Sequence, residues 1–105
     1  MKVKIKEESW FARLAAWKLE SKTMAAVLGN TIHLWNVSRE DFLNSPSWVV
    51  HELVHVRQFR QYGFLGFGFL YILESVRNGY RNNRFEIEAR KAEGDPKSFD
   101  TVEFI

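Results

Sequence analysis

The sequence predicts a single α+β domain over residues 1–105, in which a small antiparallel sheet packs on helices. Two segments repeat apolar residues at helical spacing, one near residues 10–19 and one near residues 46–62. Two runs of β-forming residues, 23–28 and 31–35, flank a Gly-Asn pair that is typical of a hairpin turn. With 105 residues, of which 46% are hydrophobic and 15% aromatic, the chain can bury one core but not two.

Composition excludes several classes of protein. The net charge is only +2, which is no electrostatic footprint for nucleic acid. The absence of Cys excludes disulfides, Cys-ligated zinc and thiol nucleophiles, and it suits a reducing cytoplasm. The basic start of the chain turns acidic at Glu7-Glu8 where a secretory signal would be apolar, and the longest apolar run, 64–73, is too short to cross a bilayer. We therefore expect a cytoplasmic protein with no transmembrane segment and no nucleic-acid partner.

The N-terminal third predicts a strand, a helix and the hairpin. Residues 2–6 alternate Lys with Val and Ile, which indicates a short edge strand with its lysines outward. The helix over residues 10–19 carries Trp10 and Trp17, which we expect in the core, although a basic helix with two Trp could also lie on a membrane. Gly29 suits a type II′ hairpin turn.

Cap residues divide the rest of the chain into helices. Ser38 opens a short helical turn, and Ser45-Pro46 starts the helix that ends at Tyr62-Gly63. A Phe/Gly-rich turn is expected over residues 63–68, followed by a helix over 69–78 that an αL Gly79 stops.

The C-terminal segment predicts one more helix. Asn82 or Asn83 caps a short helix over residues 84–93, which Gly94 ends. Residues 98–105 carry no clear signal and form either a terminal strand or a loose tail.

The central helix contains the motif H-E-x-x-H at His51, Glu52 and His55. Two His at i and i+4 lie on one helical face, so both imidazoles can reach one metal ion. Glu52 lies one residue round the helix, where it can touch a metal-bound water without replacing a ligand. His pairs on helices are also satisfied without a metal, but two imidazoles in a Val-rich helix would be costly to bury without partners. The pattern therefore predicts a metal site, with Glu52 as its catalytic base.

A catalytic zinc typically keeps three protein ligands and one water, so one more ligand is needed. Glu86 and Glu88 on the helix after Asn83 are the candidates, and His33 in the hairpin is a weaker one, either as a ligand or as a substrate contact. A lone His on a strand is more often an ordinary half-exposed residue.

Taken together, the H-E-x-x-H helix and the downstream Glu86-Ile87-Glu88-Ala89 resemble the glutamate-type zinc metallopeptidases, or gluzincins. Over roughly Met24 to Glu93 the chain is also similar to small bacterial H-E-x-x-H domains of unassigned function that are labelled metallopeptidases. The resemblance implies a minimal zincin-like core, in which His51, His55 and Glu86 hold Zn²⁺ and Glu88 is the runner-up.

The same resemblance implies a peptidase that acts on a peptide or protein substrate through a metal-activated water. The pattern departs from the family at Arg90, where an Asp usually orients a ligand His. Tyr71, Tyr80 and His33 are candidates for stabilising the tetrahedral intermediate. A hairpin edge beside the site would pair with an extended peptide.

Two other kinds of function remain open from the sequence. One is a catalytically inert zinc-binding module, because so small a chain lacks a second lobe and would need a partner protein to complete a cleft. The other is a protein that docks on a membrane surface or a partner through the Trp helix and the Phe/Gly segment. The intact Glu52 favours the peptidase over both.

Overall fold

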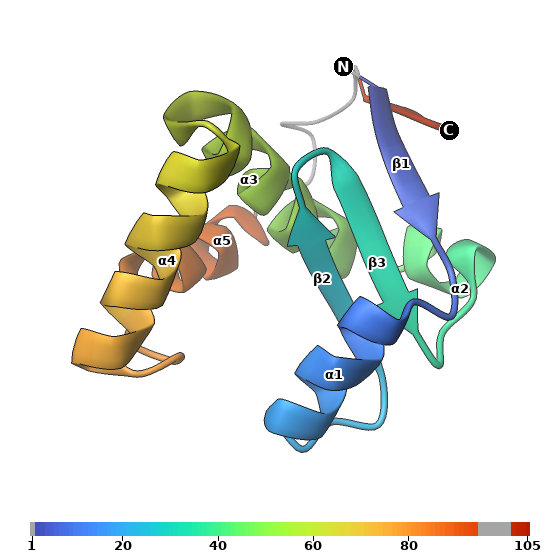
Figure 1. Cartoon of the computed structure of the whole chain (residues 1–105). Coiled ribbons are helices and arrows are strands. Elements are labelled where there is room, and N and C mark those ends of the chain that lie inside the picture. Colours follow the sequence, from blue (N-terminus) through green and yellow to red (C-terminus); the bar gives the residue numbers. More distant parts are fainter. Residues whose placement is uncertain (1, 95–101) are drawn as a thin grey trace.

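The computed structural model describes residues 2–94 and 102–105, which form an α+β fold. A four-stranded sheet and helices on both of its faces make up the layers (Figure 1). The elements, in chain order, are β1 (Lys2–Lys6), α1 (Trp10–Lys18), β2 (Met24–Leu28), β3 (Thr31–Trp35), α2 (Arg39–Leu43), α3 (Pro46–Tyr62), α4 (Phe64–Asn78), α5 (Arg84–Ala92) and β4 (Glu103–Phe104).

The sheet is mixed, so the expectation of an antiparallel sheet is wrong. The strand order is β2-β3-β1-β4, and only the β2–β3 hairpin is antiparallel. Because α1 carries the chain across the sheet before β2, the hairpin returns β3 alongside β1 in the same direction, with Ile5 opposite Ile32. The C-terminal strand β4 adds to the other side of β1, also in parallel.

The strand β1 is an inner strand, which corrects its prediction as an edge. Its three lysines do point outward, and Val3 is fully buried, as the alternation indicates. The sheet edges are instead β2 and the short β4. For the last residues the sequence left a terminal strand or a loose tail open, and residues 103–104 form a strand. Residues 98–101 lie outside the described part of the chain.

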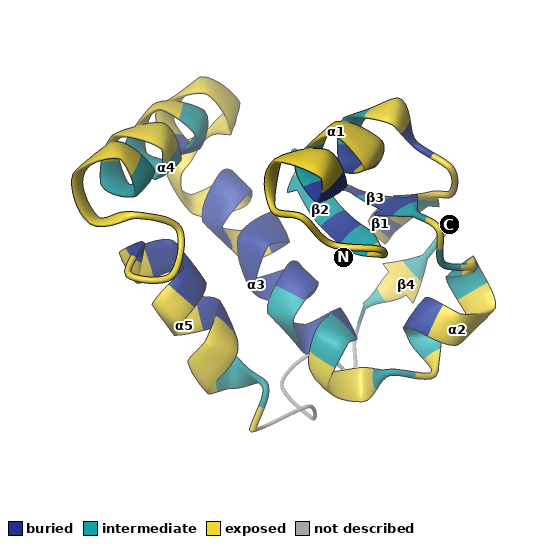
Figure 2. Ribbon diagram, turned by 90° about the horizontal axis from the view of Figure 1, so that it is seen from below, coloured by how far each residue is buried: buried dark blue, intermediate teal, exposed yellow. Residues whose placement is uncertain are grey.

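The main core lies between the sheet and α3. Ile32 and Leu34 from β3 pack with Leu53 and Val56 from α3, and Phe42 of α2 closes one end. Figure 2 shows that α3 is the most buried helix, whereas α1 covers the opposite face of the sheet. The helix that carries the H-E-x-x-H motif is therefore held by the sheet along one side.

The Trp side chains of α1 are exposed, which contradicts their prediction as core. Trp10 and Trp17 are 71% and 76% exposed, and the residues that α1 buries are Ala12 and Ala16. A helix can approach a sheet more closely through small side chains, and this places the large ones on its outer side.

The Phe/Gly segment is helical, so the turn expected over residues 63–68 is wrong. The break between α3 and α4 is Gly63 alone, whose φ of 80° and ψ of 160° are accessible essentially only to Gly. Gly79 has a similar conformation, with φ 78° and ψ 166°, and so it stops α4 without being αL. Phe67 of α4 packs with Phe59 of α3 and Phe85 of α5 in a second cluster that joins the three helices.

Several local predictions hold. Gly29 has a positive φ of 68°, as a type II′ turn requires at its first central residue. Ser38 accepts a hydrogen bond from the Asp41 amide and so caps α2. Of the two Asn before α5, it is Asn83 that caps the helix, by accepting from the Phe85 amide at 2.8 Å.

The fully buried Asn83 also joins α5 to α4. Its Nδ2 donates to the Tyr71 carbonyl at 3.2 Å and to Ser75 Oγ at 2.9 Å. The Asn83 side chain thus hydrogen-bonds a free amide at the start of α5 and two acceptors on α4. These bonds fix where α5 begins.

We expect Asn83→Ala to lower the free energy of unfolding by about 2–4 kcal/mol, since it removes a cap and leaves buried acceptors without donors. Asn82→Ala, at the exposed neighbouring position, should change it by less than about 0.5 kcal/mol. Urea denaturation measures both variants. Equal losses would show that Asn83 has no special role.

Candidate metal centre

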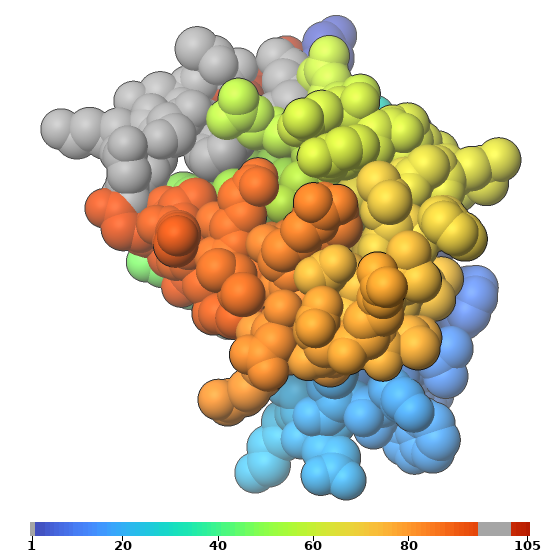
Figure 3. Space-filling view, turned by 90° about the vertical axis from the view of Figure 1, so that its left-hand side faces the viewer, coloured from blue at the N-terminus to red at the C-terminus, as the bar shows by residue number. Residues whose placement is uncertain are grey.

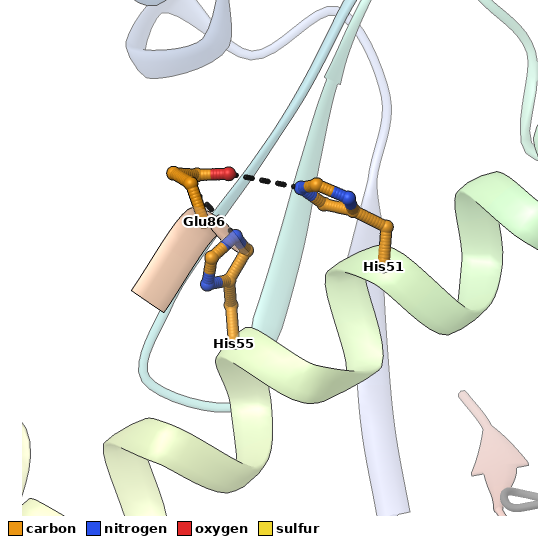
Figure 4. Close-up of side chains that lie close together, drawn as sticks. All are labelled: His51, His55 and Glu86. Atoms are coloured by element: carbon orange, nitrogen blue, oxygen red, sulfur yellow. Dashed lines mark hydrogen bonds and ion pairs between the residues drawn. The ribbon is translucent and has the colours of Figure 1, made fainter. Parts of the chain in front are cut away.

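The structure brings His51 and His55 of α3 together with Glu86 of α5 (Figure 4). His51 Nε2 lies 3.0 Å from Glu86 Oε1, and His55 Nε2 lies 3.2 Å from Glu86 Oε2. One atom from each of the three residues can be chosen so that all lie within 4.8 Å of one another. The three side chains therefore converge on one point between the two helices.

Glu86, rather than Glu88, occupies this point. Glu86 is only 3% exposed and faces α3, whereas Glu88 is exposed. Residues two apart on a helix point about 200° apart, so both cannot face α3. The side of α5 that packs on α3 therefore brings in Glu86, the residue that the resemblance implied, and leaves the runner-up Glu88 outside.

A buried glutamine fixes the orientation of His55. Gln58 Nε2 donates to the Phe85 carbonyl, which can only accept, so Gln58 Oε1 must be the atom 2.8 Å from His55 Nδ1. His55 Nδ1 therefore carries a proton, which leaves Nε2 as the nitrogen available to a metal. The arrangement matches the outer hydrogen bond that metal-binding His residues usually make.

Glu93 does the same for His51. Its Oε2 accepts from His51 Nδ1 at 2.7 Å, so His51 also directs Nε2 toward Glu86. Glu93 lies seven residues after Glu86, at the C-cap of α5 and on the same side as Glu86. Arg90, at the position where related patterns have Asp, turns away and donates to the Arg81 carbonyl. A carboxylate beside His51 is thus present, but it comes from one turn further along the helix.

The buried charge of Glu86 is balanced by hydrogen-bond donors. Burial would raise the pKa of Glu86, but hydrogen bonds from His51, His55 and Tyr71 hold that pKa well below its usual range. The Tyr71 hydroxyl on α4 donates to Glu86 Oε2 at 2.5 Å. Burial alone would lower the pKa of both His residues, but their hydrogen bonds to Glu86 leave each pKa above its ordinary value.

Glu52 is also buried, but its neighbours offset the cost of burying its charge less well than those of Glu86 do. It is 5% exposed, and burial raises its pKa to about 8 although the neighbouring His55 lowers it. Nearby Glu86 and Glu93 raise it further, whereas a hydrogen bond with Trp48 lowers it. A carboxyl group with a pKa near neutrality is suited to exchanging protons.

A cavity of about 590 Å³ opens beside these groups. His51, Glu52 and Glu93 line one side, and the edge strand β2 contributes Met24 and Ala25. Trp48, Tyr80, the residues just before β2 and those at the start of α3 complete its wall. The cavity thus joins the candidate site to an unpaired strand edge.

His33 does not belong to this site, which corrects its prediction as a ligand or substrate contact. Ile32 and Leu34 face α3, so the alternation of β3 turns His33 to the face that α1 covers. There its Nδ1 is hydrogen-bonded to Ser9 Oγ at 2.7 Å, and its ring lies against Phe11.

Sequence reasoning missed the roles of Gln58 and Glu93, and of Trp48 beside Glu52. Gln58 carried a local signal, since it lies three residues after His55 on the same side of the helix. Glu93 lies two turns after Glu86 on α5, which indicates its side of that helix but not its partner. Trp48 precedes Glu52 by four residues and could have been found by the same spacing.

Comparisons with known proteins add no relative: no family model matches the chain, and no curated protein or solved structure does so either. No helix within the described residues is both long and apolar enough to span a bilayer. The site is therefore interpreted from its own geometry.

Glu93→Ala should weaken the affinity of the candidate site for a divalent metal ion, assayed with Zn²⁺, by about 10–100-fold, because His51 would lose the carboxylate that orients it. Glu88→Ala removes the same charge from an exposed position on α5 and should stay within about threefold of the wild type, as screening predicts. Competition with a chromophoric chelator measures both affinities. Equal weakening in the two variants would reduce the effect of Glu93 to general electrostatics.

Glu52→Gln should stabilise the metal-free protein increasingly as the pH rises. A carboxyl group whose folded pKa is raised from 4.5 to about 8 contributes stability below pH 4.5, and this is lost as the pH approaches 8. An amide does not ionise, so the variant should gain up to about 5 kcal/mol over the wild type by pH 8. Urea denaturation between pH 5 and pH 8 measures the difference. An equal trend in Glu88→Gln would contradict this origin.

Proposed function

We propose that this chain is a zinc-dependent peptidase with a zincin-like site, in which His51, His55 and Glu86 hold the ion and Glu52 is the catalytic base. The observation that carries the proposal is the orientation of both imidazoles, whose Nδ1 atoms are bound by Gln58 and Glu93 so that both Nε2 atoms meet at Glu86. A helix that needed only a buried ion pair would not require both outer hydrogen bonds.

The donor set fits zinc. Two imidazole nitrogens and one carboxylate oxygen form an established catalytic ligand set. Ligands about 2.0–2.1 Å from a tetrahedral zinc lie about 3.3–3.4 Å from one another. The separations of 3.0 Å from His51 to Glu86 Oε1 and 3.2 Å from His55 to Glu86 Oε2 are close to that spacing, and one atom from each of the three residues can be chosen so that all lie within 4.8 Å of one another.

When bound, zinc would lower the pKa of a coordinated water toward ~7 and polarise the substrate carbonyl. Glu52 accepts the proton of the attacking water and donates it to the leaving amine. A cation beside Glu52 favours its ionised form, so the raised pKa near 8 would fall toward the range that a base requires. Trp48 holds the Glu52 carboxylate by a hydrogen bond.

Tyr80 is the residue that we assign to the tetrahedral intermediate. It lines the cavity, which Tyr71 does not, although the hydroxyls of both tyrosines are hydrogen-bonded to Glu86. The intermediate carries a developing negative charge that such a donor stabilises.

The free edge of β2 supports an extended peptide as the substrate. Strand addition there would place the peptide backbone along Met24 and Ala25, beside Glu52. The cavity is open, and a partner protein would complete the cleft on its far side.

Glu52→Gln should retain one zinc per chain and lose hydrolysis by about 10²–10⁴-fold, because the amide cannot accept the water's proton. Elemental analysis gives the zinc content, and a peptide library read by mass spectrometry gives turnover. His55→Ala should lose both zinc and turnover.

The outcomes separate the alternatives. Zinc binding by a wild type that cleaves nothing in the library would favour the inert binding module. Full zinc in His55→Ala would refute the site as drawn, and wild-type turnover in Glu52→Gln would refute the mechanism.

A further inference from the structure

The outer side of α4 is a continuous apolar surface. Leu65, Phe69, Ile72, Leu73 and Val76 follow one another at i, i+4, i+7, i+8 and i+11, which places them on one side of the helix. All five are exposed, and Leu65 and Val76 reach 82% and 79%. The inner side of the helix carries Phe67 and Tyr71, which pack on α3 and α5. We call the five exposed residues the α4 stripe.

The helix α1 has the same arrangement. Trp10, Leu14 and Trp17 lie at i, i+4 and i+7, and each is more than half exposed. Ala12 and Ala16 on the opposite side pack on the sheet. We call the three exposed residues the α1 stripe.

Both helices lie on one side of the molecule. They are nearest the viewer in Figure 1, and Figure 2 shows both along the same edge with their exposed sides outward. In Figure 3 the side chains of α4 project from the surface, and α1 lies below them. This surface projects and has no groove, so it suits a flat or soft partner better than a partner helix, which binds in a groove.

Basic side chains accompany these stripes. On α1, exposed Arg13 and Lys18 flank the stripe on either side, whereas the acids Glu8 and Glu20 lie beyond the helix ends. On α4 the first ten residues carry no charge, and Glu74 points away from the stripe and bonds to Asn78.

Exposed arginines lie at both ends of α4. Arg60 lies in the last turn of α3, just before α4 begins. Arg77 lies in the last turn of α4, and Arg81 follows that helix. Helices that lie in a membrane interface typically have an apolar face with Trp, Leu and Phe, and basic residues border that face.

We propose that the α1 and α4 stripes dock this protein on an anionic lipid surface, with both helices in the interface plane. A second copy fits less well, since a two-fold contact of stripe on stripe would bring the bordering arginines of α4 close to their own copies. Exposed Trp residues are favoured at the lipid headgroup level, where Trp10 and Trp17 would lie. This inference is independent of zinc and of hydrolysis.

Vesicle binding tests the proposal with the full chain. The protein should co-sediment with vesicles of phosphatidylcholine and phosphatidylglycerol in a 7:3 ratio, and much less with phosphatidylcholine alone. Tryptophan fluorescence should shift to shorter wavelength on binding, since Trp10 and Trp17 would leave water. Binding should weaken as salt increases.

Two variants separate the apolar and the charged contributions. Phe69→Gln with Ile72→Gln should weaken binding by at least about tenfold, because the α4 stripe would lose its centre. Arg60→Glu with Arg77→Glu should weaken binding to the anionic vesicles by at least about 25-fold, with each reversal costing about fivefold or more.

Each variant has a matched control. Ile87→Gln changes an exposed apolar residue on α5, and Arg84→Glu with Lys91→Glu makes the same charge change on that helix, outside both stripes. Both controls should bind within about threefold of the wild type, because Ile87 lies outside the stripes and the charges on α5 are screened from the lipid surface. Circular dichroism checks that every variant is folded, which the exposure of the changed residues favours.

Three results would overturn the proposal. One is a wild type that binds neither kind of vesicle, and another is equal weakening in the variants and their controls. The third is a dimer in light scattering that Phe69→Gln with Ile72→Gln dissociates while vesicles bind nothing, which would assign the stripes to a second copy.

Discussion

The ionised carboxylate of Glu86 lies in the interior with only 3% of its residue surface exposed, and such a charge is costly unless donors surround it. Those donors come from two other helices, His51 and His55 from α3 and Tyr71 from α4. The observed arrangement of the three helices therefore keeps this buried charge hydrogen-bonded on all sides that they contribute. The aromatic cluster of Phe59, Phe67 and Phe85 joins the same three helices, so apolar packing and charge satisfaction specify the same geometry.

Most of what depends on near neighbours in the chain could be predicted, and the helical Phe/Gly segment at the start of α4 was an exception. The i, i+4 pair of His51 and His55, the caps Ser38 and Asn83 and the hairpin at Gly29 are local, because one helix turn or one tight turn fixes their geometry. The sequence also offered Glu86 or Glu88 as the third residue, the family resemblance favoured Glu86, and the packing of α5 on α3 brings Glu86 to the two His.

What depends on long-range packing was not predictable. Nothing in residues 2–6 shows that β3 and β4 will flank β1, since pairing partners are set by how α1 crosses the sheet. Trp10 and Trp17 were expected inside because large apolar residues usually are, but Ala12 and Ala16 were the side chains small enough for that contact. Arg90 was interpreted as a missing carboxylate, whereas Glu93 supplies one from a turn further along α5.

The helix α4 serves two purposes in this structure. Its inner side completes the candidate site, and its outer side is part of the molecular surface. On its inner side Tyr71 holds Glu86, and the backbone and Ser75 accept from Asn83. Its outer side remains apolar at five positions, which ordinary surface helices fill with charged residues. Burial of the inner side cannot account for that composition, so the apolar outer side of α4 requires a separate cause, and contact with a lipid surface would provide one.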